Sequence, residues 1–233
     1  DPARPGRVRA LELGELVRRE QVIGEALHAL ARVGLLAPGL ARADVEGDRG
    51  QKVVELGGGD RPALKSIGGI NLDVRPMPGV DIVADLNQPL PLGSQEFDGV
   101  LSIFLLEHIS WRRVRGFIQE IHRILKPGGQ AILVTSNLLE QARKLVNTPI
   151  WMEEHVCMVF GDNDYPENTH RCGFSPEYAV RLFKQAGFHE VQVTPLQKDG
   201  PPCTPLRLQR HRSPRSATSL LPLVHSKQGP SVS

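Results

Sequence analysis

The chain of 233 residues has no long apolar run, few cysteines and little net charge. No segment approaches the roughly 18 apolar residues that a membrane-spanning helix needs, so we expect no membrane span. The first residues, DPARPGRVRALELGEL, lack the apolar core of a signal peptide, which favours a cytoplasmic protein. The three cysteines, Cys157, Cys172 and Cys203, form no close pair and are expected to be reduced thiols.

The charge is unevenly distributed along the chain. The formal net charge is +2, but from residue 197 onward six Lys or Arg stand against one acid, Asp199. The rest of the chain is therefore slightly acidic, which argues against general nucleic-acid binding. The spacings of His and Cys match no tetrahedral zinc pattern, so we expect no metal site.

Short apolar strands alternate with helical segments between residues 52 and 136. The expected strands are KVVEL, GGINLDV, VDIVADL, FDGVLSIF and QAILVTS, with HEVQVTPL as a sixth and PLRLQRH as a weak candidate for a seventh. Amphipathic spacing predicts a helix over WRRVRGFIQEIHRIL, and Ser175 with Pro176 begins another. The alternation predicts an α/β fold, a Rossmann-like doubly wound, mostly parallel sheet of six to seven strands with helices on both faces.

Three regions follow from this pattern. Residues 1–50, with helical spacing over 8–36, are expected to form an N-terminal helical extension that covers a site on the main domain, 51–196. Within that domain, 137–174 is a polar insertion that we expect to be irregular. Residues 197–233 are expected to be a disordered basic tail, dispensable for folding from residue 205 onward.

The stretch VVELGGGD places an acid and three glycines directly after the first strand. In an open parallel sheet, ligands bind at the carboxyl ends of the strands. A dinucleotide fingerprint begun by Gly57 and Gly59 would need a third glycine where this chain has Pro62. Glu55 and Asp60 flank the turn, and nearby anions disfavour a pyrophosphate. The turn therefore indicates a ligand with a cationic group near Glu55.

Two further acids end the next two strands. Asp73 follows the second strand, where a carboxylate can accept hydrogen bonds from both hydroxyls of a ribose. Asp85 ends the third strand, where it can accept from an exocyclic amine such as that of adenine. An adenosine with a cationic amino-acid end matches all three acids, and S-adenosylmethionine has that shape.

The segments VVELGGGD, INLDV, VADL, FDGVLSIFLLEHI and LKPGGQAILV, in this order, resemble class I S-adenosylmethionine-dependent methyltransferases of the methyltransferase type 11-like group. The resemblance covers roughly residues 50–195, and it departs from the family at Arg61, where a third glycine is usual. It implies S-adenosylmethionine as the cofactor. The cofactor contacts that it implies are Glu55, Gly57, Gly58, Gly59, Asp73, Val74, Asp85, the Leu86 backbone, Ser102 and Phe104.

The acceptor side is expected to lie in the insertion and after the fourth strand. DNDYPENTHRCGF overhangs the transfer site in this fold, and long loops in compact domains are often functional. Glu107 and His108 form a pair that the family commonly carries. We take His108 and His170 as the candidate catalytic bases, because an imidazole can remove a proton from a hydroxyl near neutral pH.

The sequence thus predicts transfer of a methyl group to a small-molecule or sugar acceptor, with O-methylation as the expected chemistry. Two alternatives stay open at this point. One is a non-catalytic S-adenosylmethionine-binding protein of the same fold, and the other is a nicotinamide oxidoreductase, which Pro62 disfavours. The sequence leaves the oligomeric state open.

Overall fold

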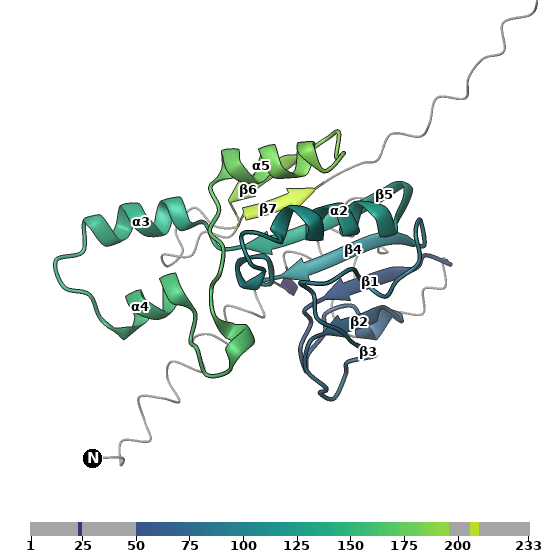
Figure 1. Cartoon of the computed structure of the whole chain (residues 1–233), viewed down its shortest axis with the longest axis horizontal. Helices are drawn as coiled ribbons and strands as arrows, with labels where there is room; N and C mark the ends of the chain where they lie inside the picture. Colours follow the sequence, from purple (N-terminus) through teal and green to yellow (C-terminus); the bar gives the residue numbers. More distant parts are fainter. Residues whose placement is uncertain (1–22, 25–49, 196–205, 210–233) are drawn as a thin grey trace, which may run out of the picture.

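The computed structural model describes residues 23–24, 50–195 and 206–209, which contain one sheet in the order β3-β2-β1-β4-β5-β7-β6 (Figure 1). The strands are β1 (Val53–Leu56), β2 (Ile70–Asp73), β3 (Ile82–Val83), β4 (Phe97–Ile103), β5 (Leu125–Thr135), β6 (Gln192–Pro195) and β7 (Leu206–Gln209). Strands β1 to β5 pair in parallel, and β7 lies antiparallel between β5 and β6. The mostly parallel, Rossmann-like α/β fold expected from the sequence is confirmed.

Helices connect these strands. The described α-helices are α2 (Val114–Ile124), α3 (Leu138–Val146), α4 (Glu153–Phe160) and α5 (Pro176–Gln185), and the short 3-10 helices are η1 (Lys65–Ile67), η2 (Leu106–His108) and η3 (Pro166–Asn168). None of the helices in this described part has the length and apolar character needed to cross a membrane.

The core lies on both faces of the sheet, because side chains alternate along each strand. Leu56, Val100 and Leu133 join one buried cluster with the apolar residues of α2 and α5, and these two helices contact each other. Residues an odd number of positions away, such as Val53 and Leu101, point to the opposite face and are buried as well. Of the helical region expected over 8–36, the structure describes only residues 23–24, which are helical.

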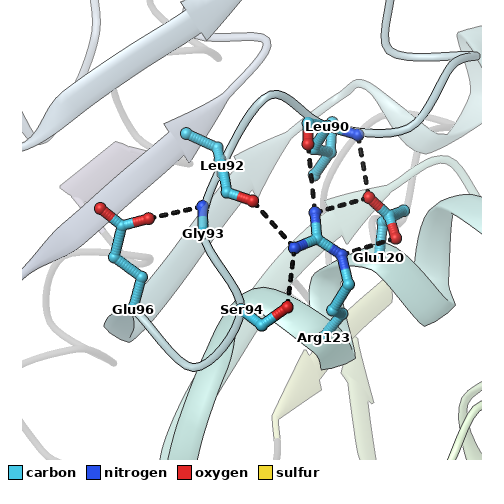
Figure 2. Close-up of polar contacts among 7 residues, drawn as sticks. All are labelled: Leu90, Leu92, Gly93, Ser94, Glu96, Glu120 and Arg123. Carbon is cyan, nitrogen blue, oxygen red and sulfur yellow. Dashed lines mark hydrogen bonds and ion pairs between the residues drawn. The ribbon is translucent and has the colours of Figure 1, made fainter.

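Arg123 of α2 holds the loop between β3 and β4. Figure 2 shows its hydrogen-bond partners, which are the carbonyls of Leu90 and Leu92, the hydroxyl of Ser94 and the carboxylate of Glu120. The hydrogen bond from Arg123 lowers the pKa of Glu120, which also accepts from the Leu90 N–H at 2.9 Å. These hydrogen bonds of Arg123 fix the loop that follows Asp85 and Leu86, the residues expected to contact adenine.

The insertion over 137–174 is more regular than expected. It contains α3, α4 and η3, so the expectation of an irregular segment was wrong. Asn137 caps α3 by accepting a hydrogen bond from the Glu140 N–H at 3.3 Å. An Asn at the N-cap satisfies an N–H that the first helical turn leaves unpaired, and the sequence Asn-x-x-Glu carries that signal.

The expectation of a disordered tail was also wrong for residues 206–209. They form β7, which pairs with β5 and with β6. The strand lies within PLRLQRH, the weak candidate for a seventh strand, and it gains hydrogen-bonded neighbours on both sides. The rest of 197–233 lies outside the described residues.

This strand leads to a truncation prediction. A chain that ends at residue 205 should melt at least about 5 °C below a chain that ends at residue 209, because β6 loses its hydrogen-bonded neighbour and β5 loses a partner. Thermal melting followed by circular dichroism compares the two. Equal midpoints would show that β7 adds nothing to stability.

Candidate active site

The site starts at the point where the strand order reverses. The chain leaves β1 toward β2 and β3 and returns to β4 on the other side of β1, so the ends of β1 and β4 form a topological switch point. Gly57 there adopts a left-handed conformation (φ 75°), and a Cβ on it would lie 3.0 Å from Cδ1 of Leu105. A Cβ on Gly58 would lie 2.5 Å from Oδ1 of Asn71. The turn therefore packs so closely against the neighbouring strand ends that larger residues do not fit.

Asn71 of β2 holds this glycine turn in place, and sequence reasoning missed it. Its side chain accepts from the Gly58 N–H at 3.2 Å and donates to the carbonyls of Gly59 at 2.9 Å and Gly79 at 3.0 Å. Asn71 is fully buried, so these bonds are shielded from water. The available signal was a polar residue inside an otherwise apolar strand, INLD.

Glu55 and Asp73 lie on either side of the same turn. Glu55 is buried at the end of β1, and its Oε2 accepts from the Leu64 N–H at 2.9 Å. Asp73 ends β2, and its carboxylate accepts from the Gly59 N–H and the Arg75 N–H, both at 3.0 Å. Each carboxylate oxygen has two lone pairs, so Asp73 retains capacity to accept from a ligand.

Asp85 lies on the next strand end, two residues after β3. Because Ala84 N donates to the Asp73 carbonyl at 2.9 Å, the two strand ends are adjacent. The hydrogen bond from the Asn87 backbone lowers the pKa of Asp85, which is exposed, whereas Leu86 is buried. The three acids therefore end three neighbouring strands, as the sequence predicted.

The end of β4 completes this edge of the sheet. Phe104 has φ 51°, a left-handed conformation that costs energy in a residue other than glycine and is concentrated at functional sites. Its N–H donates to the Val134 carbonyl at 2.8 Å, and the following Leu105 packs on Gly57. Ser102 lies on the buried face with Val100, and its hydroxyl has no hydrogen-bond partner within the described residues. The backbone after β4 thus brings Leu105 against Gly57. Val74 follows Asp73 directly after β2, at the same edge of the sheet.

His108 and His170 are brought together from distant parts of the chain. Their ring centroids lie 4.9 Å apart in an edge-to-face arrangement. Nδ1 of His108 lies 3.3 Å from the Thr169 carbonyl, and the backbone N–H of His170 donates to the Phe160 carbonyl at 2.9 Å. Burial lowers the pKa of both imidazoles, so both are neutral at neutral pH.

A pocket of about 310 Å³ opens beside these histidines. Its lining consists of Trp111, Ser136, Leu138, Gln141, Val159, Phe160, His170, Arg171, Cys172 and Gly173. His170 belongs to the lining and His108 does not. Burial raises the pKa of the Cys172 thiol to about 11, so this thiol stays protonated and is a poor nucleophile.

Glu107 is not part of the pocket lining but forms hydrogen bonds with three residues that are, Ser136, Arg171 and Cys172. Its buried carboxylate accepts from the Thr135 hydroxyl at 2.8 Å and from the Ser136 N–H at 3.2 Å, and burial raises its pKa. Its backbone carbonyl accepts from the N–H groups of Arg171 at 2.7 Å and Cys172 at 3.0 Å. Glu107 thereby joins the end of β4 to the end of β5 and to the 170–172 segment.

The edge and the pocket suit two different ligands. The edge offers main-chain groups of a glycine turn and, at the ends of three neighbouring strands, the carboxylates of Glu55, Asp73 and Asp85, which can accept hydrogen bonds. The pocket offers apolar side chains such as Trp111, Leu138 and Phe160 together with the polar groups of Ser136, Gln141, His170 and Arg171. The residues of the edge therefore fit S-adenosylmethionine, and the pocket is lined by a separate set of residues.

Comparisons with known proteins identify the family of this chain. A family model described as a methyltransferase domain matches residues 20–193. An uncharacterized methyltransferase of Synechocystis sp. is 33% identical over a match that covers 36% of this chain and 47% of the relative. The match thus spans about half the length of that relative.

Solved structures share the fold. They include an S-adenosylmethionine-dependent methyltransferase from Mesorhizobium loti (TM-score 0.50, 16% identity, 70% of this chain and 91% of the other). They also include the Burkholderia thailandensis 1,6-didemethyltoxoflavin-N1-methyltransferase with bound S-adenosylhomocysteine (0.52, 16%, 88% and 85%). A third comes from the complex of the Haloferax volcanii Trm112 methyltransferase activator with a putative methyltransferase (0.51, 19%, 83% and 96%).

Proposed function

Because the chain belongs to the class I S-adenosylmethionine-dependent methyltransferases, we propose that it methylates a hydroxyl group of a small-molecule or glycan acceptor held in the pocket beside His170. The observation that supports this proposal most is the position of the pocket. Its lining includes Ser136, directly after β5, and Arg171, whose charge acts on Asp85, and its wall carries an imidazole whose pKa is lowered by burial.

On the cofactor side, S-adenosylmethionine supplies a methyl group that its sulfonium already activates. Glu55 and the turn Gly57–Gly59 hold the methionine end, and Asp73 accepts hydrogen bonds from the ribose hydroxyls. Asp85, the Leu86 backbone and Val74 surround the adenine, while Ser102 and Phe104 lie on the methionine side. Since the methyl group needs no further activation, the residues of this edge contribute mainly by positioning.

On the acceptor side, His170 accepts the proton of the acceptor hydroxyl at an imidazole nitrogen. An imidazole with a lowered pKa is neutral near pH 7 and can therefore take up this proton. The edge-to-face ring of His108 restricts the orientation of His170. The apolar side chains of the pocket exclude water from the transferred group.

A panel of acceptors tests the chemistry. The full chain is incubated with methyl-labelled S-adenosylmethionine and with pairs of hydroxylated and aminated aromatic compounds and sugars. Labelled methyl ethers, formed together with S-adenosylhomocysteine, would support the proposal. Labelled amines with no ether would contradict it.

The pH dependence gives a second test. Burial lowers the pKa of His170 below its usual 6.5, so the base stays neutral to a lower pH than a free imidazole does and is lost only as the pH falls through this lower value. The single-turnover rate at saturating cofactor should therefore be flat between about pH 7 and pH 8 and fall at acid pH. A rate that keeps rising above about pH 8 would contradict a histidine base.

A further inference from the structure

The segment 161–171, called the strap here, crosses the edge of the sheet at which the parallel strands end. It connects α4 to the residues before α5 and contains η3 in its middle. One end lies at β4, where Glu107 O accepts from the Arg171 N–H. The glycine turn of β1 lies between this end and β2, according to the strand order.

The middle of the strap reaches the residues that follow β2. The guanidinium carbon of Arg75 lies 3.7 Å from the ring centroid of Tyr165, which is a close cation–π contact. The backbone N–H of the same Arg75 donates to Oδ1 of Asp73 at 3.0 Å. Arg75 thus links Tyr165 to Asp73, the carboxylate assigned to the ribose.

A second interaction also joins the strap to the adenosine side. The charge of Arg171 contributes to lowering the pKa of Asp85, the carboxylate assigned to adenine. Arg171 also donates to the Pro166 carbonyl at 2.5 Å, which places its side chain along the strap. Arg171 thus places one positive charge of the strap near Asp85, while the strap also carries Asp162, Asp164 and Glu167.

The polar side chains of the strap mainly hold its own shape. Asn168 donates to Asp164, and Thr169 donates to Asn163, each at 2.6 Å. Gly161 has φ 79°, and a Cβ on it would lie 2.1 Å from the Asn168 carbonyl oxygen. The polar residues that the sequence suggested for acceptor recognition thus build a preformed turn that presents Tyr165.

From these contacts we propose that Arg75 and Tyr165 form the outer wall of the S-adenosylmethionine site and close its adenosine half. Within this wall, Arg75 donates its backbone N–H to Asp73 and packs its guanidinium on Tyr165 of the strap. The ring and the planar guanidinium both present flat faces suited to contact with a nucleoside. A bound adenosine leaves the site only when the contact between Arg75 and Tyr165 opens, so this contact controls the residence time of the cofactor and of its product.

The dissociation rate of S-adenosylhomocysteine from the immobilised full chain, measured by surface plasmon resonance, tests this wall without any acceptor. Tyr165→Leu and Arg75→Met should each raise the rate by about tenfold, the order expected from a lost cation–π contact. Tyr165→Phe keeps the ring and should stay within about twofold of wild type. Tyr178→Leu is the matched control, because Tyr178 is the other tyrosine of the chain and stacks on Phe174 instead.

The outcomes separate this inference from the assignment of the cofactor site. Wild-type dissociation rates in both Tyr165→Leu and Arg75→Met, with binding intact, would overturn the wall and leave the cofactor site standing. An equal increase in Tyr165→Phe and Tyr165→Leu would also overturn it, because the ring would then not matter. A wild-type chain that fails to bind S-adenosylhomocysteine would overturn both the wall and the cofactor site.

Discussion

Replacing His170 with Gln is expected to lower the single-turnover rate of methyl transfer by about 10²–10⁴-fold, the usual contribution of a positioned base. His170 lines the pocket, and burial keeps its imidazole neutral at the pH at which it must accept a proton. Glutamine keeps a polar side chain of similar length but cannot take up that proton. The affinity for S-adenosylhomocysteine should stay near the wild-type value, because we assign the cofactor to the edge formed by β1, β2 and β3.

Two matched variants accompany this measurement. His189→Gln changes an exposed histidine just before β6 and should leave the rate unchanged. His108→Gln should have a smaller effect than His170→Gln, since His108 is not part of the pocket lining. If His170→Gln turns over at the wild-type rate, no base acts at this position. If it loses cofactor binding as well, the division into a cofactor edge and an acceptor pocket is wrong.

Replacing Asp73 with Ala is expected to weaken binding of S-adenosylhomocysteine by roughly 1.5–3 kcal/mol, the range for hydrogen bonds to a charged group. The substitution removes the acceptor assigned to the ribose and also the bonds that Asp73 accepts from Gly59 and Arg75. Asp73→Asn keeps the shape of the side chain and one acceptor oxygen. It should therefore fall between Asp73→Ala and wild type in isothermal titration calorimetry.

Asp98→Asn provides the control for this series. Asp98 also accepts from a backbone N–H, that of Lys52 at 2.8 Å, and pairs with Lys126 at 2.7 Å, but it lies at the start of β4 and so at the opposite edge of the sheet. This variant should lower the melting temperature and leave the affinity unchanged. Equal affinities of wild type and Asp73→Ala would reject the ribose contact.

The edge of the site could be predicted from the sequence because of simple geometry. Strands that pair in parallel end at the same edge, so Glu55, Asp73 and Asp85 had to lie near one another once the alternation of strands and helices was recognised. The same reasoning placed His108 and His170 on one side, since each follows a strand that ends at this edge.

Other parts of the site depend on contacts that leave no periodic signal. Asn71 braces the glycine turn through three side-chain hydrogen bonds, which a strand pattern does not reveal. The contact between Arg75 and Tyr165 joins two loops, and its partners are decided by the path of the strap. β7 was underestimated because its stability comes from neighbours on both sides and not from its own four residues.

The central claim is that the edge formed by β1, β2 and β3 binds S-adenosylmethionine. The most direct test is isothermal titration calorimetry of the full chain with S-adenosylhomocysteine and, separately, with NAD. The account predicts saturable one-to-one binding of S-adenosylhomocysteine and no binding of NAD. Glu55 places a negative charge beside the turn, where it would repel a pyrophosphate, and Pro62 occupies the position at which a dinucleotide-binding turn has its third glycine. Binding of NAD without binding of S-adenosylhomocysteine would contradict it.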